Sequence, residues 1–307
     1  MSTAVSIPAP ARTQLHTARP SFVGIVRGEL FKVSRQISTW ILGILLLGAI
    51  GMPHLVILAS GRLKEQAQTA PTDALYSLLG VDMMVLKVFG GAFLIILTAR
   101  LIGMEYSGGT IRVILSRGVG RLQLLFGKLI ALVIVALGVV VLTVLLDFLL
   151  GGVITLLGTG NLDIFKAATN AYWSDSGTYL LLALISLGVT ILMATAVAVV
   201  GRSLAFGLSV AMLWYPAENF SLILLLLGFK LTKNDFWQLI SGDMLGLNLN
   251  AMAAGVLPER AMRAASINFN TPLVPVDGGH TLLVTAIFAV VFAAVAIILT
   301  ARRDVKE

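Results

Sequence analysis

One long, markedly cationic segment interrupts the apolar runs of this sequence, and it extends from Arg100 to Lys128. An acid, Glu105, comes shortly before a pair of glycines, which let a chain leave a helix sharply. The residues that follow form a short apolar helical pattern, which Ser107 or Thr110 could cap. Arginines spaced along this pattern can form paired hydrogen bonds with carboxylates. The segment therefore has the chemistry of a docking surface for an acidic partner protein.

The cations of this segment also have a simpler explanation. Lys and Arg residues beside membrane spans set topology, and this role accounts for any one of the arginines. It does not account for an acid placed next to a Gly-Gly break. We therefore predict a docking surface that uses eight residues: Glu105, Tyr106, Gly108, Gly109, Thr110, Arg112, Arg117 and Arg121.

Two carboxylates, Asp147 and Glu218, fall inside apolar runs. Glu218 follows Trp214-Tyr215-Pro216, and the proline removes a backbone donor, so a kink or break is predicted there. An acid within a membrane must face a cavity, find a partner or take up a proton. Two interpretations stay open. These five residues could form a substrate pathway or gate, or the two acids could reach the outer interface or pair structurally with Lys87.

The composition excludes several classes of protein. Hydrophobic residues make up 58% and charged residues only 12% of the chain, and the mean hydropathy is +0.96, so this is not a soluble domain. There are no cysteines, which excludes disulfides and thiol chemistry. His16, His54 and His280 lack the spacing of a metal motif, so no metal site is predicted. The net charge of +7 is explained by cytoplasmic cations, and no nucleic-acid partner is predicted.

Apolar runs of membrane-spanning length recur along the chain and predict one all-α integral membrane domain over residues 39–304. Residues 1–21 have no apolar core and are predicted to form a disordered cytoplasmic tail. Residues 22–38 are typical of an amphipathic helix in the headgroup layer. The six predicted spans are about 40–59, 83–102, 124–157, 178–200, 204–229 and 281–300.

The segments between the spans carry the polar residues. Residues 61–81 are predicted to be a polar loop, 103–123 a cytoplasmic loop, and 230–279 an outer loop that could re-enter the membrane. Most of the 22 Lys and Arg residues lie in the N-terminal segment, in residues 100–128 and at the C-terminus. Because positive charge is retained inside, both termini and the loop over 103–123 are predicted to be cytoplasmic.

These features resemble the permeases of ATP-binding-cassette (ABC) exporters of the type-2 family. The resemblance rests on Glu105, on Gly109-Thr110, on the apolar step over 111–115, and on Arg121 and Lys128. In that family a similar cytoplasmic loop follows the second of six spans, and a connecting helix precedes the first. The resemblance covers roughly residues 22–304, and it implies a coupling function for the eight residues of the docking surface.

The resemblance implies a permease subunit of an ATP-driven exporter in the cytoplasmic membrane, surrounded by lipid and paired with a second permease chain. ATP and Mg²⁺ would be bound by separate cassette ATPase subunits, because the phosphate-binding pattern of Gly, four residues and Gly-Lys-Ser/Thr is not found in this sequence. The chain is therefore not expected to be an enzyme or to hold a cofactor. The substrate could be a drug, peptide, lipid or polymer.

Two other classes of membrane protein have weaker support in the sequence. A secondary transporter driven by an ion gradient could use Asp147 and Glu218 as ion-coupling acids. Inverted internal repeats would favour that class, and none is visible in the sequence. A lipid-modifying membrane enzyme would require clustered His or Asp residues at the interface, and the sequence shows no such cluster.

Overall fold

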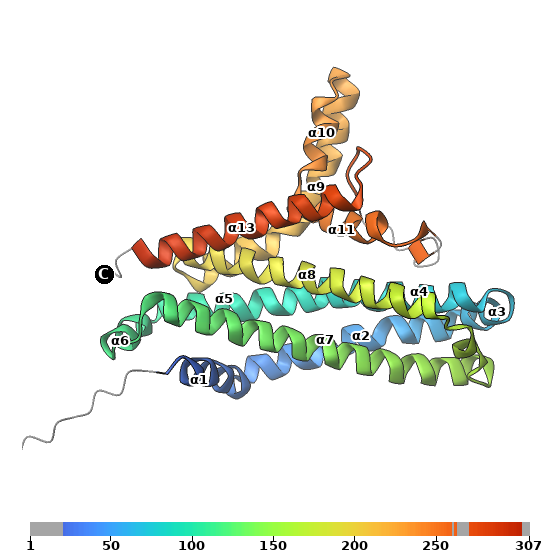
Figure 1. Cartoon of the computed structure of the whole chain (residues 1–307), viewed down its shortest axis with the longest axis horizontal. Helices are drawn as coiled ribbons and strands as arrows, with labels where there is room; N and C mark the ends of the chain where they lie inside the picture. Colours follow the sequence, from blue (N-terminus) through green and yellow to red (C-terminus); the bar gives the residue numbers. More distant parts are fainter. Residues whose placement is uncertain (1–20, 260, 263–269, 303–307) are drawn as a thin grey trace, which may run out of the picture.

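The computed structural model describes residues 21–259, 261–262 and 270–302, and these residues form helices and connections without any strand. The helices build an elongated bundle (Figure 1). The tail predicted to be disordered lies, except for Ser21, outside the described residues.

Six helical segments in the described residues are long and apolar enough to cross a membrane, which confirms the predicted number of spans. The second is a composite of 37 residues, Pro71–Ser107. It consists of α4 (Pro71–Val85), a π-helical turn η1 (Leu86–Gly90) and α5 (Gly91–Ser107). The other five are α2 (Ile37–Ser60), α7 (Arg121–Thr159), α8 (Asn170–Gly201), α9 (Leu204–Thr232) and α13 (Gly278–Arg302).

Shorter helices lie at the two ends of the bundle and beside α9. At one end, here called the α6 end, lie α1 (Phe22–Arg35), α6 (Thr110–Ser116) and the last turn of α13 (Figure 1). The opposite end, here called the α3 end, holds α3 (Arg62–Thr69) and the 3₁₀ helix η2 (Asp163–Ala167). The remaining short helices are α10 (Phe236–Gly242) and α11 (Leu245–Val256).

The centre of the bundle is formed by the composite span and α8. In each, 67% of the most apolar window is buried, and α8 packs against α5, α9 and α13. The peripheral helices expose large apolar side chains instead. Leu45 on α2, Leu149 on α7 and Leu224 on α9 are each more than 60% exposed, which suits helices whose outer faces contact lipid.

The prediction of a polar loop over residues 61–81 is wrong, because most of this segment is helical. Pro71 occupies the first turn of α4, where its fixed φ and missing N–H are tolerated. Leu63, Leu75 and Leu78 face the core, while the charged residues of α3 face outward. The polar side chains of α3 therefore cover one face of an amphipathic helix, and the helical segment that contains the second predicted span begins at Pro71.

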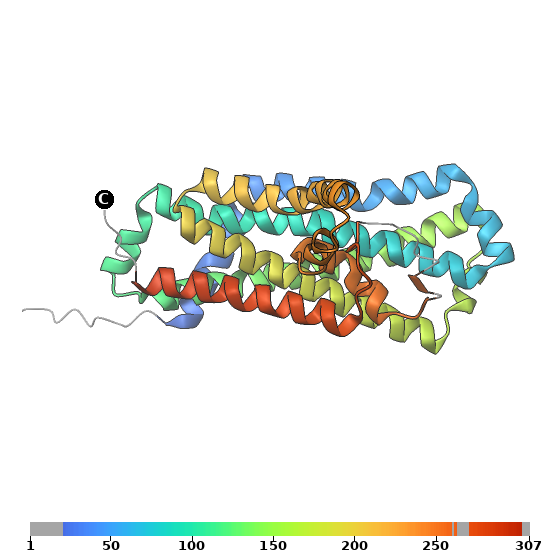
Figure 2. The same cartoon turned by 90° about the horizontal axis from the view of Figure 1, so that it is seen from above.

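α9 remains one helix across Pro216 but changes direction. Its first part lies along the bundle, and its last part leaves the bundle sideways together with α10 (Figure 1). In Figure 2 this last part is seen end-on. A proline inside a helix removes one backbone hydrogen bond and bends the helix. The predicted disturbance in this helix is thus present as a bend, without a break.

Candidate functional site

The chain reverses direction at the α6 end through a tight turn. α5 ends at Ser107, and Gly109 has a φ of 65°, a left-handed conformation that glycine adopts at little cost. α6 follows at once and is seven residues long. The prediction that Ser107 or Thr110 caps α6 is wrong. Gly109 holds the N-cap position, and the Ser107 hydroxyl accepts a hydrogen bond from the backbone N–H of Leu204, at 3.1 Å.

α6 presents cations at the surface while its inner face is anchored. Ile111 is buried, whereas Val113 is 53% exposed, and Arg112 and Arg117 are exposed. Arg121, the first residue of α7, is half-buried. The exposed part of α6 therefore combines two guanidinium groups with a small apolar surface.

Glu105 is buried, with 7% of the residue exposed, and it forms ion pairs within the chain. Its Oε1 atom lies 2.5 Å from Lys32 Nζ and 2.7 Å from Lys128 Nζ. Both lysines also contact Glu29 at 3.0 Å. We call Glu29, Lys32, Glu105 and Lys128 the charge cluster. It has no net charge, and it joins α1, α5 and α7.

Burial alone would lower the pKa of Lys32, but the hydrogen bond and negative charge of Glu105, together with those of Glu29, outweigh it and leave the pKa above its ordinary value. Lys128 gives a further hydrogen bond to the carbonyl oxygen of Leu101, at 3.0 Å. A buried charge is tolerated when partners satisfy it in this way. The cluster therefore fixes α1 against the ends of α5 and α7.

The eight predicted docking residues thus have different environments. Arg112 and Arg117 face outward, as do Gly108, Gly109 and Thr110, whereas Tyr106 is half-buried and Glu105 faces the charge cluster. Sequence reasoning missed Glu29 and Lys32. Their spacing of three residues on an amphipathic helix was a signal for a pair on one face, but nothing local indicated that this face is turned inward.

A cavity of about 380 Å³ lies beside the bend of α9. Its polar lining comes from η1, α8, α9 and α11 and includes Lys87, Ser186, Thr190, Tyr215, Asn219 and Asn250. Lys87 belongs to the π-helical turn, an irregularity found frequently at functional sites. Its Nζ atom donates to the carbonyl oxygen of Leu249, at 2.9 Å. The sequence left open a structural pair between Lys87 and Asp147. In the structure, Lys87 contacts Leu249 instead.

Of the predicted gate residues, Tyr215 and Pro216 line this cavity. Glu218 lies behind them and is 9% exposed. Its carboxylate accepts hydrogen bonds from Trp214 Nε1, at 2.9 Å, and from the backbone N–H of Gly246 in the first turn of α11. The N-terminus of a helix favours a negative charge. Glu218 therefore joins α9 to α11.

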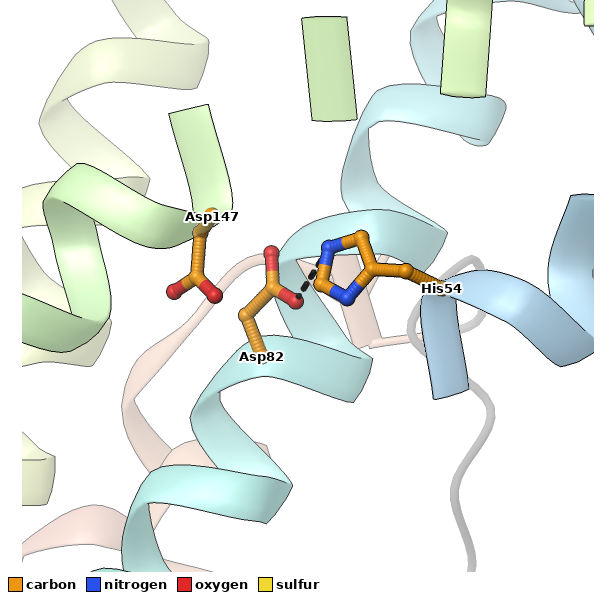
Figure 3. A group of neighbouring side chains, drawn as sticks. All are labelled: His54, Asp82 and Asp147. Atoms are coloured by element: carbon orange, nitrogen blue, oxygen red, sulfur yellow. Dashed lines mark ion pairs between the residues drawn. The ribbon is translucent and has the colours of Figure 1, made fainter. Parts of the chain in front are cut away.

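Asp147 lies elsewhere, on the face of α7 that meets α4. It borders a second cavity of about 270 Å³ together with Asp82. The side chains of Asp82, Asp147 and His54 come together beside this cavity (Figure 3).

Six apolar helices of spanning length, with a short helix between the second and third, define a multi-pass membrane protein. The chain belongs to the ABC-2 transporter family, because the family model described as ABC-2 family transporter protein matches residues 25–218. The match extends from α1 through Glu218 and includes the charge cluster and α6. The chain is thus a permease, a membrane subunit of an ABC transporter that works with an ATPase subunit. No curated protein matches the chain in sequence.

Proposed function

We propose that this permease exports its substrate, and that separate cassette ATPase subunits drive it by pressing on α6. The proposal rests on the exposure of Arg112 on α6 and of Arg117 directly after it, while buried Ile111 anchors the inner side of this helix. Exposed guanidinium groups suit paired contacts with carboxylates of a docked protein. A short helix anchored by a buried side chain can transmit a push to the helices that it contacts.

The contacts of α6 with neighbouring helices could transmit a displacement of α6 to the membrane spans. α6 is joined to α5 through the turn at Gly109, and the charge cluster ties α5 to α1 and α7. The end of α5 also touches the start of α9, since a Cβ atom on Gly103 would lie 2.8 Å from Leu204 Cα. A displacement of α6 would therefore move α1, α5, α7 and the first part of α9 together.

These helices reach the cavity of 380 Å³ beside the bend of α9. Its lining of one lysine, several hydroxyl and amide groups and apolar side chains suits an amphiphilic substrate. We propose that motion of α5 and α9 opens this cavity towards a second permease chain and then towards the α3 end. Tyr215 and Pro216 would act as the gate, and Trp214 and Glu218 would hold α9 on α11.

The cationic α6 end is proposed to be cytoplasmic, with both termini on that side. This end carries the arginines of α6 together with Lys32 and Arg35 of α1 and Arg302 of α13. Lys and Arg near the ends of spans are retained on the cytoplasmic side. α1 would then lie in the headgroup layer of the inner leaflet.

The test is purification of the chain from its own membranes, with the bound ATPase identified by its phosphate-binding sequence. We expect the complex, but not the permease alone, to hydrolyse ATP. Joint replacement Arg112→Glu and Arg117→Glu should weaken ATPase binding at least about tenfold, because it puts like charges across the interface. Arg62→Glu is the matched control, since Arg62 is exposed on α3 at the other end. Equal binding by all three proteins would contradict docking on α6.

A further inference from the structure

Three side chains far apart in the sequence converge near the α3 end of the bundle. They are His54 on α2, Asp82 on α4 and Asp147 on α7 (Figure 3). One nitrogen or oxygen atom of each lies within 4.8 Å of the others. Asp82 lies between the other two in Figure 3, and its Oδ1 atom is 3.3 Å from His54 Nε2. The cavity beside them is also lined by Phe165 of η2, which locates the group towards the α3 end.

The orientation of the imidazole is set by the backbone. His54 Nδ1 lies 2.9 Å from the carbonyl oxygen of Ile50, and a carbonyl only accepts, so Nδ1 carries the hydrogen. In the neutral ring Nε2 then holds a lone pair. This lone pair faces the Asp82 carboxylate, which is also an acceptor. Two acceptors at this distance require a positive charge between them.

The side chains nearby do not supply that charge. His54 is 1% exposed, and its Nε2 has no hydrogen-bond donor or acceptor partner among the described residues. Both Asp147 oxygens are likewise buried without a hydrogen-bond partner there. In the described part of the chain, no Lys or Arg forms an ion pair with Asp82 or Asp147. Two carboxylates are thus left uncompensated in a buried position, which is costly.

A shared proton would satisfy only part of this group. It would bridge His54 and Asp82 and leave the Asp147 carboxylate charged. A second proton on Asp147 would remove that charge but would still leave the Asp147 oxygens without a hydrogen-bond partner. A divalent cation would balance both carboxylates and give all three side chains a ligand contact. The neutral imidazole with its Nδ1–H on a backbone carbonyl is also the form in which histidine binds metals.

We propose that His54, Asp82 and Asp147 bind a divalent first-row transition-metal ion of the Zn²⁺ type. One nitrogen and two carboxylate oxygens form a three-residue ligand set, which leaves a further position for water. Mg²⁺ and Ca²⁺ fit this set less well, because they take oxygen ligands in larger numbers. The cavity of about 270 Å³ provides the space through which an ion and its water can enter.

A bound ion would tie α2, α4 and α7 together at the α3 end. The proposal does not depend on the ATPase docking proposed above, because its residues are remote from α6. From the sequence no metal site is predicted, because the three histidines lack the spacing of a metal motif, and this proposal departs from that prediction.

The test uses the full chain, purified without a polyhistidine tag and stripped with a chelator. Equilibrium dialysis against Zn²⁺, with metal counted by elemental analysis, should give one ion per chain. The variants His54→Gln, Asp82→Asn and Asp147→Asn should each lower Zn²⁺ affinity at least about tenfold, since loss of an outer partner alone has that effect. Asp163→Asn and His280→Gln are controls, because Asp163 is exposed and paired with Lys166 and His280 contacts Gly242.

A spectroscopic measurement guards against variants that merely fold poorly. The chain has no cysteine, so Asp147→Cys introduces the only thiol. Binding of Co²⁺ to this variant should produce a thiolate-to-metal absorption band that Asp163→Cys does not produce. Absence of Zn²⁺ binding by the wild-type chain, or equal affinity in the wild type and the three ligand variants, would overturn the proposal and leave a shared proton as the function of the group.

Discussion

Lys32 on α1 and Glu105 at the end of α5 are 73 positions apart in the sequence, and their charged atoms lie 2.5 Å from each other. Lys128 of α7 contacts the same Glu105 oxygen. A helix that precedes the first span is thereby fixed to the second and third. Movement of α6 cannot displace α5 or α7 without acting on α1, unless this cluster breaks.

We expect Glu105→Gln to destabilise the chain by about 3–5 kcal/mol, because removal of one buried acid leaves Lys32 and Lys128 with Glu29 as their only shared acidic partner and one positive charge in excess. Thermal unfolding in detergent measures the effect. Glu65→Gln is the control, since Glu65 is exposed on α3 and its replacement should change stability by less than about 0.5 kcal/mol. Similar unfolding of the two variants would show that the cluster contributes little.

The pH dependence of stability should report on Lys32. Its pKa is raised in the folded chain above the ordinary value of 10.5, so its stabilising effect is complete below that value and is lost as pH rises through the folded pKa. The difference in unfolding temperature between wild type and Lys32→Met should therefore be constant from neutral pH to about 9 and shrink above 10.5. A difference that grows with pH would have the wrong sign.

The turn before α6 should resist substitution. Gly109 has a positive φ, and a β-branched residue there costs about 1–2 kcal/mol. We expect Gly109→Val to insert normally and to lower ATP turnover by the complex, because the turn that aims α6 is altered. Gly138→Ala is a matched control, since nothing lies within 4 Å of a Cβ atom at that position of α7. Undiminished turnover by Gly109→Val would argue against a rigid α6.

Neighbouring residues on α9 should differ in access to water. Asn219 lines the cavity, whereas Glu218 is buried against α11. In this cysteine-free chain, Asn219→Cys should react with a small water-soluble thiol reagent, and Glu218→Cys should react much more slowly. Lys233→Cys, exposed at the end of α9, gives the upper limit of the rate. Faster reaction at 218 than at 219 would contradict the assignment of Glu218 as a contact between α9 and α11.

The number of spans and the family were predictable because their signals are local. An apolar run of about 20 residues reports a span wherever its neighbours lie, and the charges around α6 lie within one short segment. The helices of residues 62–85 were missed because Leu63 and Leu75 face the core only after the chain folds back on α7.

The two clusters of charged residues could not be predicted from the sequence, for a different reason. Glu105 was recognised as unusual, but its exposure depends on whether α1 packs over it, and no local pattern fixes that. His54, Asp82 and Asp147 come from three separate helices, and although Asp147 was recognised as an acid within an apolar run, nothing in its own segment pointed to His54 or Asp82. Contacts of this kind depend on helix packing, which one sequence does not specify.

The length of α7 has a consequence for how the bundle fits a bilayer. Its 39 residues give a rod of about 58 Å at 1.5 Å per residue, while the hydrocarbon layer is about 30 Å thick. Even the largest usual tilt, about 40°, leaves more than ten ångströms of helix beyond the oily layer. α7 therefore extends beyond the hydrocarbon layer at one or both of its ends, so that part of the bundle stands outside the lipid core without a separate domain.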